Sequence, residues 1–354
     1  MLKKLFLTGP LIVLFSGCQI GYLMKSAYSQ ADLLRRRVPI EEALRDSRLN
    51  AEQKRKLVVA SEARIFAEND LGLAHTKNYT TFVQLDGPYV TWVVSASAKD
   101  DLKPRLWNYP LVGEMPYQGF FEPQGAKDLA AELKAEGLDT YIRGVSAYST
   151  LGWFRDPILS SMLAYKDYEL VSTIIHETTH ATVFIKSEAD FNERLAEFIG
   201  QKGAEAFYLK REGPDGATLK RMRDDADDER AFGEFITKEL YSIEAWYIEH
   251  KGVPIAEDVR QKRLRLIQAN FVSNLKPKLK DGEGFSRFEK AELNNARLLT
   301  YRLYFQDQSQ FQKVFDKLGH DFTKMLNFCR SLESSQDPVA SLAAAAAAAE
   351  AAKN

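Results

Sequence analysis

Residues 170–180 read LVSTIIHETTH, and this stretch decides the fold and chemistry expected around it. Apolar residues at helical spacing precede two histidines that stand four positions apart, which predicts a helix with one buried face. With 3.6 residues per turn, His176 and His180 project from the same face and both imidazoles can bind one Zn²⁺. A helix with two surface histidines is the alternative, but a chance match is rare in a chain with five histidines.

Glu177 lies beside the two histidines and gives the motif a chemical role. Its carboxylate can take a proton from a zinc-bound water and later pass that proton to a leaving amine, while the metal polarises the scissile carbonyl. The motif therefore predicts hydrolysis of a peptide bond, with His176 and His180 on the metal and Glu177 as general base and acid.

A catalytic zinc site usually has three protein ligands, so a third is expected nearby. We expect the first helix to continue to about Ile185, the chain to turn over residues 186–189, and a second helix to start there. At 1.5 Å per residue the chain then runs roughly 10 Å out and 9 Å back. This returns Glu193 to the level of His180 on an antiparallel neighbour, which makes Glu193 the predicted third ligand.

Other residues are candidates for roles that the motif leaves open. Glu188 and Glu197 compete with Glu193 for the metal, and Glu197 could instead accept a hydrogen bond from a ligand histidine. Peptide hydrolysis also needs a donor for the developing oxyanion, and removal of an N-terminal residue needs a pocket for its amine. The candidates are Tyr301 or Tyr304 for the donor and Asp156 or Glu169 for the pocket.

The segment before the motif suits substrate binding. Residues 145–150 can form an exposed strand edge, along which peptides commonly lie. The aromatic pair that follows, Trp153 and Phe154, belongs either to a wall of the site or to the core. Three other aromatic residues are expected in the core or at its rim: Trp107, Tyr109 and Tyr117.

The composition is that of an ordinary globular protein. The 354 residues include 48 Lys and Arg against 49 Asp and Glu, so there is no basic field for nucleic acid. Nucleic-acid binding, general disorder and a multi-span membrane protein are therefore excluded. The two cysteines, Cys18 and Cys329, are too few for a disulfide framework, and we expect Cys329 to be a buried thiol.

The N-terminus has the layout of a secretory signal. Two lysines precede a mostly apolar stretch over residues 5–15 that is too short to span a bilayer, and a small-residue processing site follows. Cys18 after Ser-Gly resembles a bacterial lipobox, in which the thiol is acylated after residues 1–17 are removed. Gln19, rather than Asp, predicts attachment to the outer membrane facing the periplasm. A plain cleaved signal or an uncleaved anchor is the alternative.

Beyond the signal, the pattern predicts an α+β fold. Residues 18–78 form a helical lead-in, residues 79–156 are β-rich, and residues 157–335 are almost entirely helical. The alanine tract within residues 336–354 is expected to be a frayed or disordered tail. A small sheet followed by helices is an α+β arrangement.

Within the β-rich region we expect four elements. Two strands, over residues 80–85 and 89–94, are separated by a Gly-Pro turn and predicted to form a hairpin. A helix over residues 125–136 and a strand over residues 140–149 follow.

Several motifs together resemble one bacterial family. They are Cys18, WNYPLVG at 107–113, AYSTLGWF at 147–154, the motif at 176–180, FNE at 191–193 and NNA at 294–296. Through these motifs the chain resembles the bacterial predicted aminopeptidase lipoproteins over nearly all of residues 18–332. This resemblance implies a zinc-dependent peptidase of the gluzincin type, with a zincin-like domain over residues 79–335 and two histidines and a downstream Glu as ligands. The chain has Arg194-Leu195 where the family has Ser-Phe.

Taken together, the residues and the resemblance predict a lipid-anchored zinc peptidase of the bacterial cell envelope. It acts on peptide or protein substrates, and aminopeptidase activity is expected. A zinc endopeptidase of envelope proteins and a non-catalytic envelope scaffold lipoprotein are the alternatives.

Overall fold

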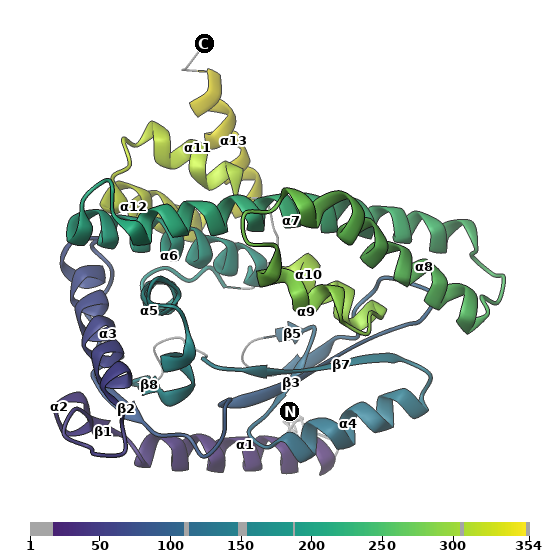
Figure 1. Ribbon diagram of the computed structural model, residues 1–354, viewed down its shortest axis with the longest axis horizontal. Helices are drawn as coiled ribbons and strands as arrows, with labels where there is room; N and C mark the ends of the chain where they lie inside the picture. The colour runs from purple at the N-terminus through teal and green to yellow at the C-terminus, as the bar shows by residue number, and fades with distance from the viewer. Residues whose placement is uncertain (1–16, 110–112, 148–153, 187, 305–307, 352–354) are drawn as a thin grey trace, which may run out of the picture.

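The structure is a computed structural model that describes residues 17–109, 113–147, 154–186, 188–304 and 308–351. It has a mixed α+β fold of mainly helices with short strands (Figure 1). The α-helices are α1 (Gly17–Arg35), α2 (Ile40–Ala43), α3 (Ala51–Asn69), α4 (Pro123–Ala135), α5 (Asp167–His180), α6 (Ala189–Glu212), α7 (Ala217–Glu249), α8 (Glu257–Asn270), α9 (Ser286–Glu289), α10 (Asn295–Tyr304), α11 (Ser309–Lys317), α12 (Phe322–Ser331) and α13 (Pro338–Ala351). The strands are β1 (Val38–Pro39), β2 (Thr81–Val83), β3 (Thr91–Ser97), β4 (Trp107–Tyr109), β5 (Gly113–Met115), β6 (Gln118–Phe120), β7 (Asp139–Val145) and β8 (Ile158–Leu159).

The described strands form three small sheets. One has the order β1-β2-β8, a second has the order β6-β3-β7, and β4 pairs with β5 alone. The longest pairing is antiparallel, between β3 and β7, and runs from Thr91 opposite Val145 to Ser97 opposite Asp139. The mixture of α and β structure follows the prediction, although β1 lies in the helical lead-in and β8 follows the β-rich region.

The hairpin predicted between residues 80–85 and 89–94 is wrong. The corresponding strands, β2 and β3, belong to different sheets. Both edges of β3 are occupied by β6 and β7, while Phe82 in β2 lies opposite Ile158 in β8. A full-length ladder with β7 makes more backbone hydrogen bonds than a short local hairpin would, so pairing distant in sequence prevails.

The helix and strand predicted next are present as α4 and β7. Pro123 stands in the first turn of α4, where a missing N–H costs nothing. Strand β7 ends at Val145, and residues 148–149 of the predicted strand lie outside the described residues. Helices α4 and α10 both pack on β3 and β7, and Figure 1 shows them on opposite faces of this sheet.

Helix α5 is held in the interior by α3 and α6, which pack against it. The apolar residues that precede the two histidines are fully buried. At the start of α3, Asn50 and Gln53 form a capping box, each side chain accepting a hydrogen bond from the backbone of the other. Because the apolar residues of α5 are buried, the histidine motif stands on an interior helix and not on a surface helix.

A buried polar network attaches the second half of the chain to β7. Arg260 of α8 donates two hydrogen bonds to Asp139, at 2.7 and 3.1 Å, and both side chains are almost fully buried. The backbone N–H of Asn295 donates to the same Asp139 carboxylate at 2.9 Å. The side-chain amide of Asn295 donates to the Ala98 carbonyl at 2.9 Å. The Asn pair that stands out in the sequence thus docks α10 onto the sheet.

Within the described residues, the alanine-rich segment forms a helix over 338–351, which corrects the expectation that this part of the tail is frayed or disordered. Helix α13 packs against α11 and buries Leu342 and Ala346. The Asp337 carboxylate accepts a hydrogen bond from the Ala340 amide at 2.8 Å and so satisfies one donor at the start of the helix. Alanine has the highest helix propensity, and a buried stripe adds the tertiary contacts that an isolated tract lacks.

The two cysteines fall in different helices, α1 and α12. Residues 1–16 of the predicted signal lie outside the described residues, and Cys18 falls in the first turn of α1. Cys329 is a fully buried free thiol, as expected, and burial raises its pKa to about 12. Among the helices of the described residues, none combines the length and the apolar character needed to cross a membrane.

The Asp139 network predicts a large loss of stability when one partner is removed. Asp139→Ala leaves the buried Arg260 guanidinium with the exposed Glu257 as its remaining described carboxylate partner, and it removes the acceptor of the Asn295 backbone N–H. We expect the free energy of unfolding to fall by about 3 kcal/mol. The control is Glu257→Gln, because Glu257 bonds to the same guanidinium from an exposed position and should cost about 1 kcal/mol or less. Urea unfolding followed by circular dichroism measures both, and equal losses would contradict this account.

Candidate metal centre

Helix α5 ends at His180, earlier than the predicted end near Ile185. The Thr178 and Thr179 hydroxyls donate to the carbonyls one turn back, at 2.6 and 2.8 Å. The Thr179 carbonyl then accepts hydrogen bonds from the amides of both Thr182 and Val183 at 2.9 Å, which closes the helix. Threonines that bond back to the preceding turn compete with helix continuation, so the connection starts sooner than periodicity suggested.

Asn192 fixes the connection between α5 and α6. Its side chain donates to the Ile185 carbonyl at 2.7 Å and accepts from the Ile185 amide at 2.9 Å. Asn192 is only 2% exposed, so both hydrogen bonds are shielded from water. This pair of bonds sets where α6 begins, and therefore where Glu193, the next residue, lies relative to α5.

Two glycines allow α5 and α6 to approach closely. A Cβ atom at Gly200 would lie 2.9 Å from the Ser172 carbonyl oxygen and 3.2 Å from the Cβ of His176. A Cβ atom at Gly203 would lie 3.0 Å from the side chain of Ile175. Larger residues at these positions would push the helices apart, so the glycines set the distance between the two faces.

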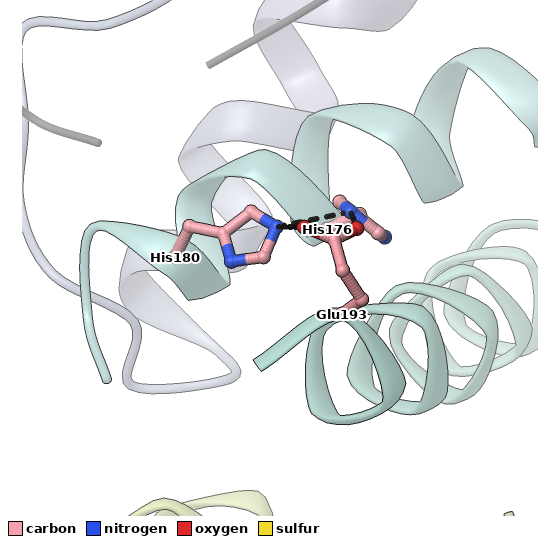
Figure 2. A group of neighbouring side chains, drawn as sticks. All are labelled: His176, His180 and Glu193. Atoms are coloured by element: carbon pink, nitrogen blue, oxygen red, sulfur yellow. Dashed lines mark hydrogen bonds and ion pairs between the residues drawn. The ribbon is translucent and has the colours of Figure 1, made fainter. Parts of the chain in front are cut away.

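The antiparallel packing of α5 and α6 brings together the three residues expected on the metal (Figure 2). His180 Nε2 lies 3.2 Å from His176 Nε2 and 3.4 Å from one Glu193 carboxylate oxygen. The other Glu193 oxygen lies 3.6 Å from His176 Nε2. These three side chains form a group that can hold a metal ion. Two imidazoles and a carboxylate suit a first-row divalent metal.

Glu197 lies one turn beyond Glu193 and contacts the other nitrogen of His176. Its carboxylate is 3.4 Å from His176 Nδ1 and accepts a hydrogen bond from the Gln201 side chain at 2.7 Å. This contact is compatible with the alternative role considered for Glu197, in which a carboxylate accepts a hydrogen bond from a ligand histidine. Glu188, the other competitor, stands at the start of α6 and is outside the metal-binding group.

The two histidines have opposite pKa shifts. Burial lowers the pKa of His176, but hydrogen bonds to Glu193 and Glu197 outweigh it and raise the pKa to about 10. Burial and the nearby charge of His176 lower the pKa of His180 to about 4. Without a metal, His176 is therefore protonated near neutral pH, whereas His180 is neutral.

Two cavities meet at the metal-binding group. One, of about 310 Å³, is lined by Glu177 and Tyr165 together with His176 and Glu197. The other, of about 500 Å³, is lined by Glu193 as well as His176 and Glu197. Glu177 is half-buried on α5 at the wall of the smaller cavity. A substrate bound at the group therefore has room on two sides.

Several predicted residues lie elsewhere. Tyr301 packs between the rings of Phe232 and Phe288, and it lines neither cavity. Asp156 is buried with its backbone bonded to Asn78 and Tyr79. The structure describes Tyr304 only as the last residue of α10.

The remaining candidates are divided between the cavities and other surroundings. Glu169 lines the smaller cavity and Tyr117 the larger one. Trp107 packs beside α4, and Phe154 is half exposed. Trp153 and residues 148–150 of the predicted strand edge lie outside the described residues.

Sequence reasoning missed the residues that act through packing between distant segments. The spacing of Gly200 and Gly203 on one helix was an available signal for close helix packing. Asp225 and Glu229 line the smaller cavity from α7, and no local pattern links them to the histidine motif. Asp225 and Glu229 reach the cavity wall only because α7 packs against α6.

This α+β protein therefore has a two-histidine, one-glutamate group, at the junction of two cavities, that could bind a metal ion. The chain belongs to the family described as "Putative aminopeptidase", whose model matches residues 21–341. That family implies a peptidase, a hydrolase acting on a peptide substrate. No curated protein and no solved structure matches the chain.

The close contact at Gly200 predicts a coupled loss of stability and metal affinity. Gly200→Ala places a methyl group against Ser172 and His176, so we expect the free energy of unfolding to fall by about 1–3 kcal/mol. Displacement of α6 should also weaken metal binding about tenfold. Gly21→Ala in α1 is the control, because nothing lies within 4 Å of the added methyl group. Unchanged metal affinity in Gly200→Ala would contradict the proposed role of this contact.

The protonated state of His176 predicts proton release on metal binding. At pH 8 its pKa of about 10 keeps the metal-free imidazole charged, so a bound metal should displace about one proton per chain. This number should fall toward zero as the pH rises through 10, and Glu197→Gln should reduce it at pH 8. Calorimetric titration in two buffers with different ionisation enthalpies measures the number, and no release at pH 8 would show that the assignment is wrong.

Proposed function

We propose that this protein is a zinc-dependent peptidase, acting as an aminopeptidase in the bacterial envelope. The observation that carries the proposal is the convergence of His176, His180 and Glu193 beside Glu177 at the junction of the cavities. Membership of the family described as "Putative aminopeptidase" supports the peptidase reaction. The metal, the mechanism and the location go beyond that membership.

The spacing of the three side chains fits zinc. Ligand atoms about 2.0–2.1 Å from a tetrahedral Zn²⁺ are separated from one another by about 3.3 Å. The ligand atoms here are separated by 3.2, 3.4 and 3.6 Å. His176, His180 and Glu193 would therefore hold the ion and leave a fourth position open. When bound, Zn²⁺ would polarise the scissile carbonyl and increase the acidity of a water molecule.

Glu177 is the proton carrier in this proposal. It follows His176 directly on α5, and its half-buried side chain lines the smaller cavity. From this place its carboxylate takes a proton from the attacking water and passes it to the leaving amine. In this proposal His176, His180 and Glu193 do not carry the proton, because their ligand atoms face one another and would be bonded to the metal.

Tyr165 replaces Tyr301 as the candidate donor to the developing oxyanion. It lines the same cavity as Glu177, whereas Tyr301 is packed in an aromatic cluster. Burial, more than the nearby Glu177 and Glu169, raises the pKa of Tyr165, so its hydroxyl stays protonated and can donate.

One observation favours the alternative of an endopeptidase. The cavities leave space on both sides of His176, so a chain could extend in both directions from the cleaved bond. Mapping the cut sites in a mixed peptide pool by mass spectrometry distinguishes the two. Single residues released from amino termini support the aminopeptidase, and internal cuts support the endopeptidase.

The envelope location is proposed from the sequence of the N-terminus. The apolar stretch and the Ser-Gly-Cys site support acylation of Cys18 after removal of residues 1–17. In this proposal the lipid anchors the protein to the outer membrane, facing the periplasm. Cys18→Ser should prevent acylation and release the protein from the membrane fraction.

The proposed roles predict different effects of three substitutions. Glu177→Gln should retain zinc and lose at least about 100-fold in cleavage rate, because an amide cannot take the water's proton. His180→Ala and Glu193→Ala should lose both zinc and cleavage. Zinc content by plasma mass spectrometry, together with cleavage of a peptide pool, measures both properties.

Glu188→Ala is the matched control, since Glu188 lies close in sequence but outside the metal-binding group. It should keep zinc and activity. Wild-type cleavage by Glu177→Gln would refute the mechanism. Full zinc content in Glu193→Ala would refute the ligand set, and no metal in the purified wild type after zinc addition would favour the scaffold.

A further inference from the structure

The smaller cavity is lined mainly by acidic and apolar side chains. Six carboxylates line it, whereas no Lys or Arg of the described residues does. They come from three helices: Glu169 and Glu177 from α5, Glu197 and Glu205 from α6, and Asp225 and Glu229 from α7. Like charges gathered around a partly enclosed space repel one another and attract a cation strongly.

Each helix presents one face to this cavity. The lining residues of α6 recur every four positions, from Glu197 through Gln201 to Glu205. Those of α7 run from Met222 to Glu229 at helical spacing. Because α6 rises 1.5 Å per residue, the acidic wall extends about 12 Å away from the metal-binding group. A group much longer than a single ammonium ion can therefore be accommodated.

Some of these carboxylates are already compensated. Lys166 lies 2.8 Å from Asp225 and 3.8 Å from Glu169. Lys202 lies 3.1 Å from Glu205, and Glu197 lies 3.4 Å from His176 Nδ1. Glu229 has no ion pair or hydrogen bond to any described residue. Glu229 is exposed to solvent, but the protein groups crowded around its carboxyl and the charges of Glu197, Asp225 and Glu169 raise its pKa to about 7. A cation entering the cavity would relieve this repulsion.

The spacing of the carboxylates favours an organic cation over a metal ion. Within the described part of the chain, only His176, His180 and Glu193 bring three ligand atoms within 4.8 Å of one another. The cavity also has apolar lining from Met222 and Ala226, which can contact a methylene stem. An acidic wall with apolar patches suits the side chain of lysine or arginine.

We infer that the smaller cavity is a specificity pocket for a positively charged side chain, lysine or arginine, next to the cleaved bond. This inference rests on the proposed peptidase function and names the substrate class of the same site. The substrate's own α-amine is too small to account for a cavity lined by six carboxylates. The larger cavity, on the other side of His176, then receives the rest of the peptide.

The test uses binding as well as cleavage. Zinc-loaded Glu177→Gln protein, which should not turn over substrate, is titrated by calorimetry with alanine-leucine hexapeptides containing one arginine or one citrulline. Citrulline has nearly the same shape as arginine but no charge. Each peptide is used with a free and with an acetylated amino terminus, so that the α-amine and the side chain are varied separately.

We expect the arginine peptides to bind at least about tenfold more tightly than the citrulline peptides, whether or not the amino terminus is acetylated. Adding Glu229→Gln, which removes a carboxylate with no described ion pair, should reduce this ratio at least about threefold. Glu234→Gln is the control, because Glu234 is exposed on α7, the helix that carries Glu229, and does not line the cavity. In the wild type, mass spectrometry should show cuts at a bond next to arginine.

Three results would overturn part of this account. Equal binding of arginine and citrulline peptides overturns the specificity pocket, even if both are cleaved. A preference set only by the free amino terminus means that the cavity holds the α-amine instead. Tight, charge-selective binding without cleavage by the zinc-loaded wild type overturns the proposed peptidase function and leaves the cation pocket intact.

Discussion

Helices α5 and α6 cross with backbone and side chains in direct contact, and the candidate site depends on this crossing. Gly200 removes the side chain that would otherwise meet Ser172 and His176. Asn192 binds both backbone groups of Ile185 and so sets the start of α6. Since a metal-binding group tolerates displacements of only about 0.5 Å, these two contacts decide whether Glu193 reaches the histidines.

The rest of the fold supports this crossing from both sides. The α3 side contributes a hydrophobic core in which the apolar face of α5 is buried. On the other side, the Arg260–Asp139–Asn295 network holds the helical second half of the chain against β7. That attachment matters for function because residues of α10 line the larger cavity and residues of α7 line the smaller one. Polar and apolar packing therefore position different walls of the same site.

Charge is concentrated where the proposed chemistry takes place. The carboxylates near His176 stabilise its protonated form in the absence of metal, and they repel one another in the adjoining cavity. In the metal-free site the proton on His176 offsets this negative charge, and a metal ion would have to displace that proton. In the adjoining cavity, the repulsion between carboxylates favours a basic side chain. Binding energy can thus be obtained by relieving repulsion that the folded chain already contains.

The sequence alone determined the local features of this protein. Periodicity predicted α4, β7 and the helical second half, and the histidine spacing predicted which residues share one face of α5, because these depend on repeats of two or 3.6 residues. The predicted connection placed Glu193 near His180, and the two side chains do lie 3.4 Å apart. This holds even though α5 ends at His180, about five residues earlier than expected. Only the tertiary structure decided which strands pair with β2 and β3. It also decided that the alanine-rich segment is an ordered helix and that carboxylates of α7 line the smaller cavity. Those features arise from contacts between segments far apart in the chain, where burial and backbone pairing outweigh local propensity.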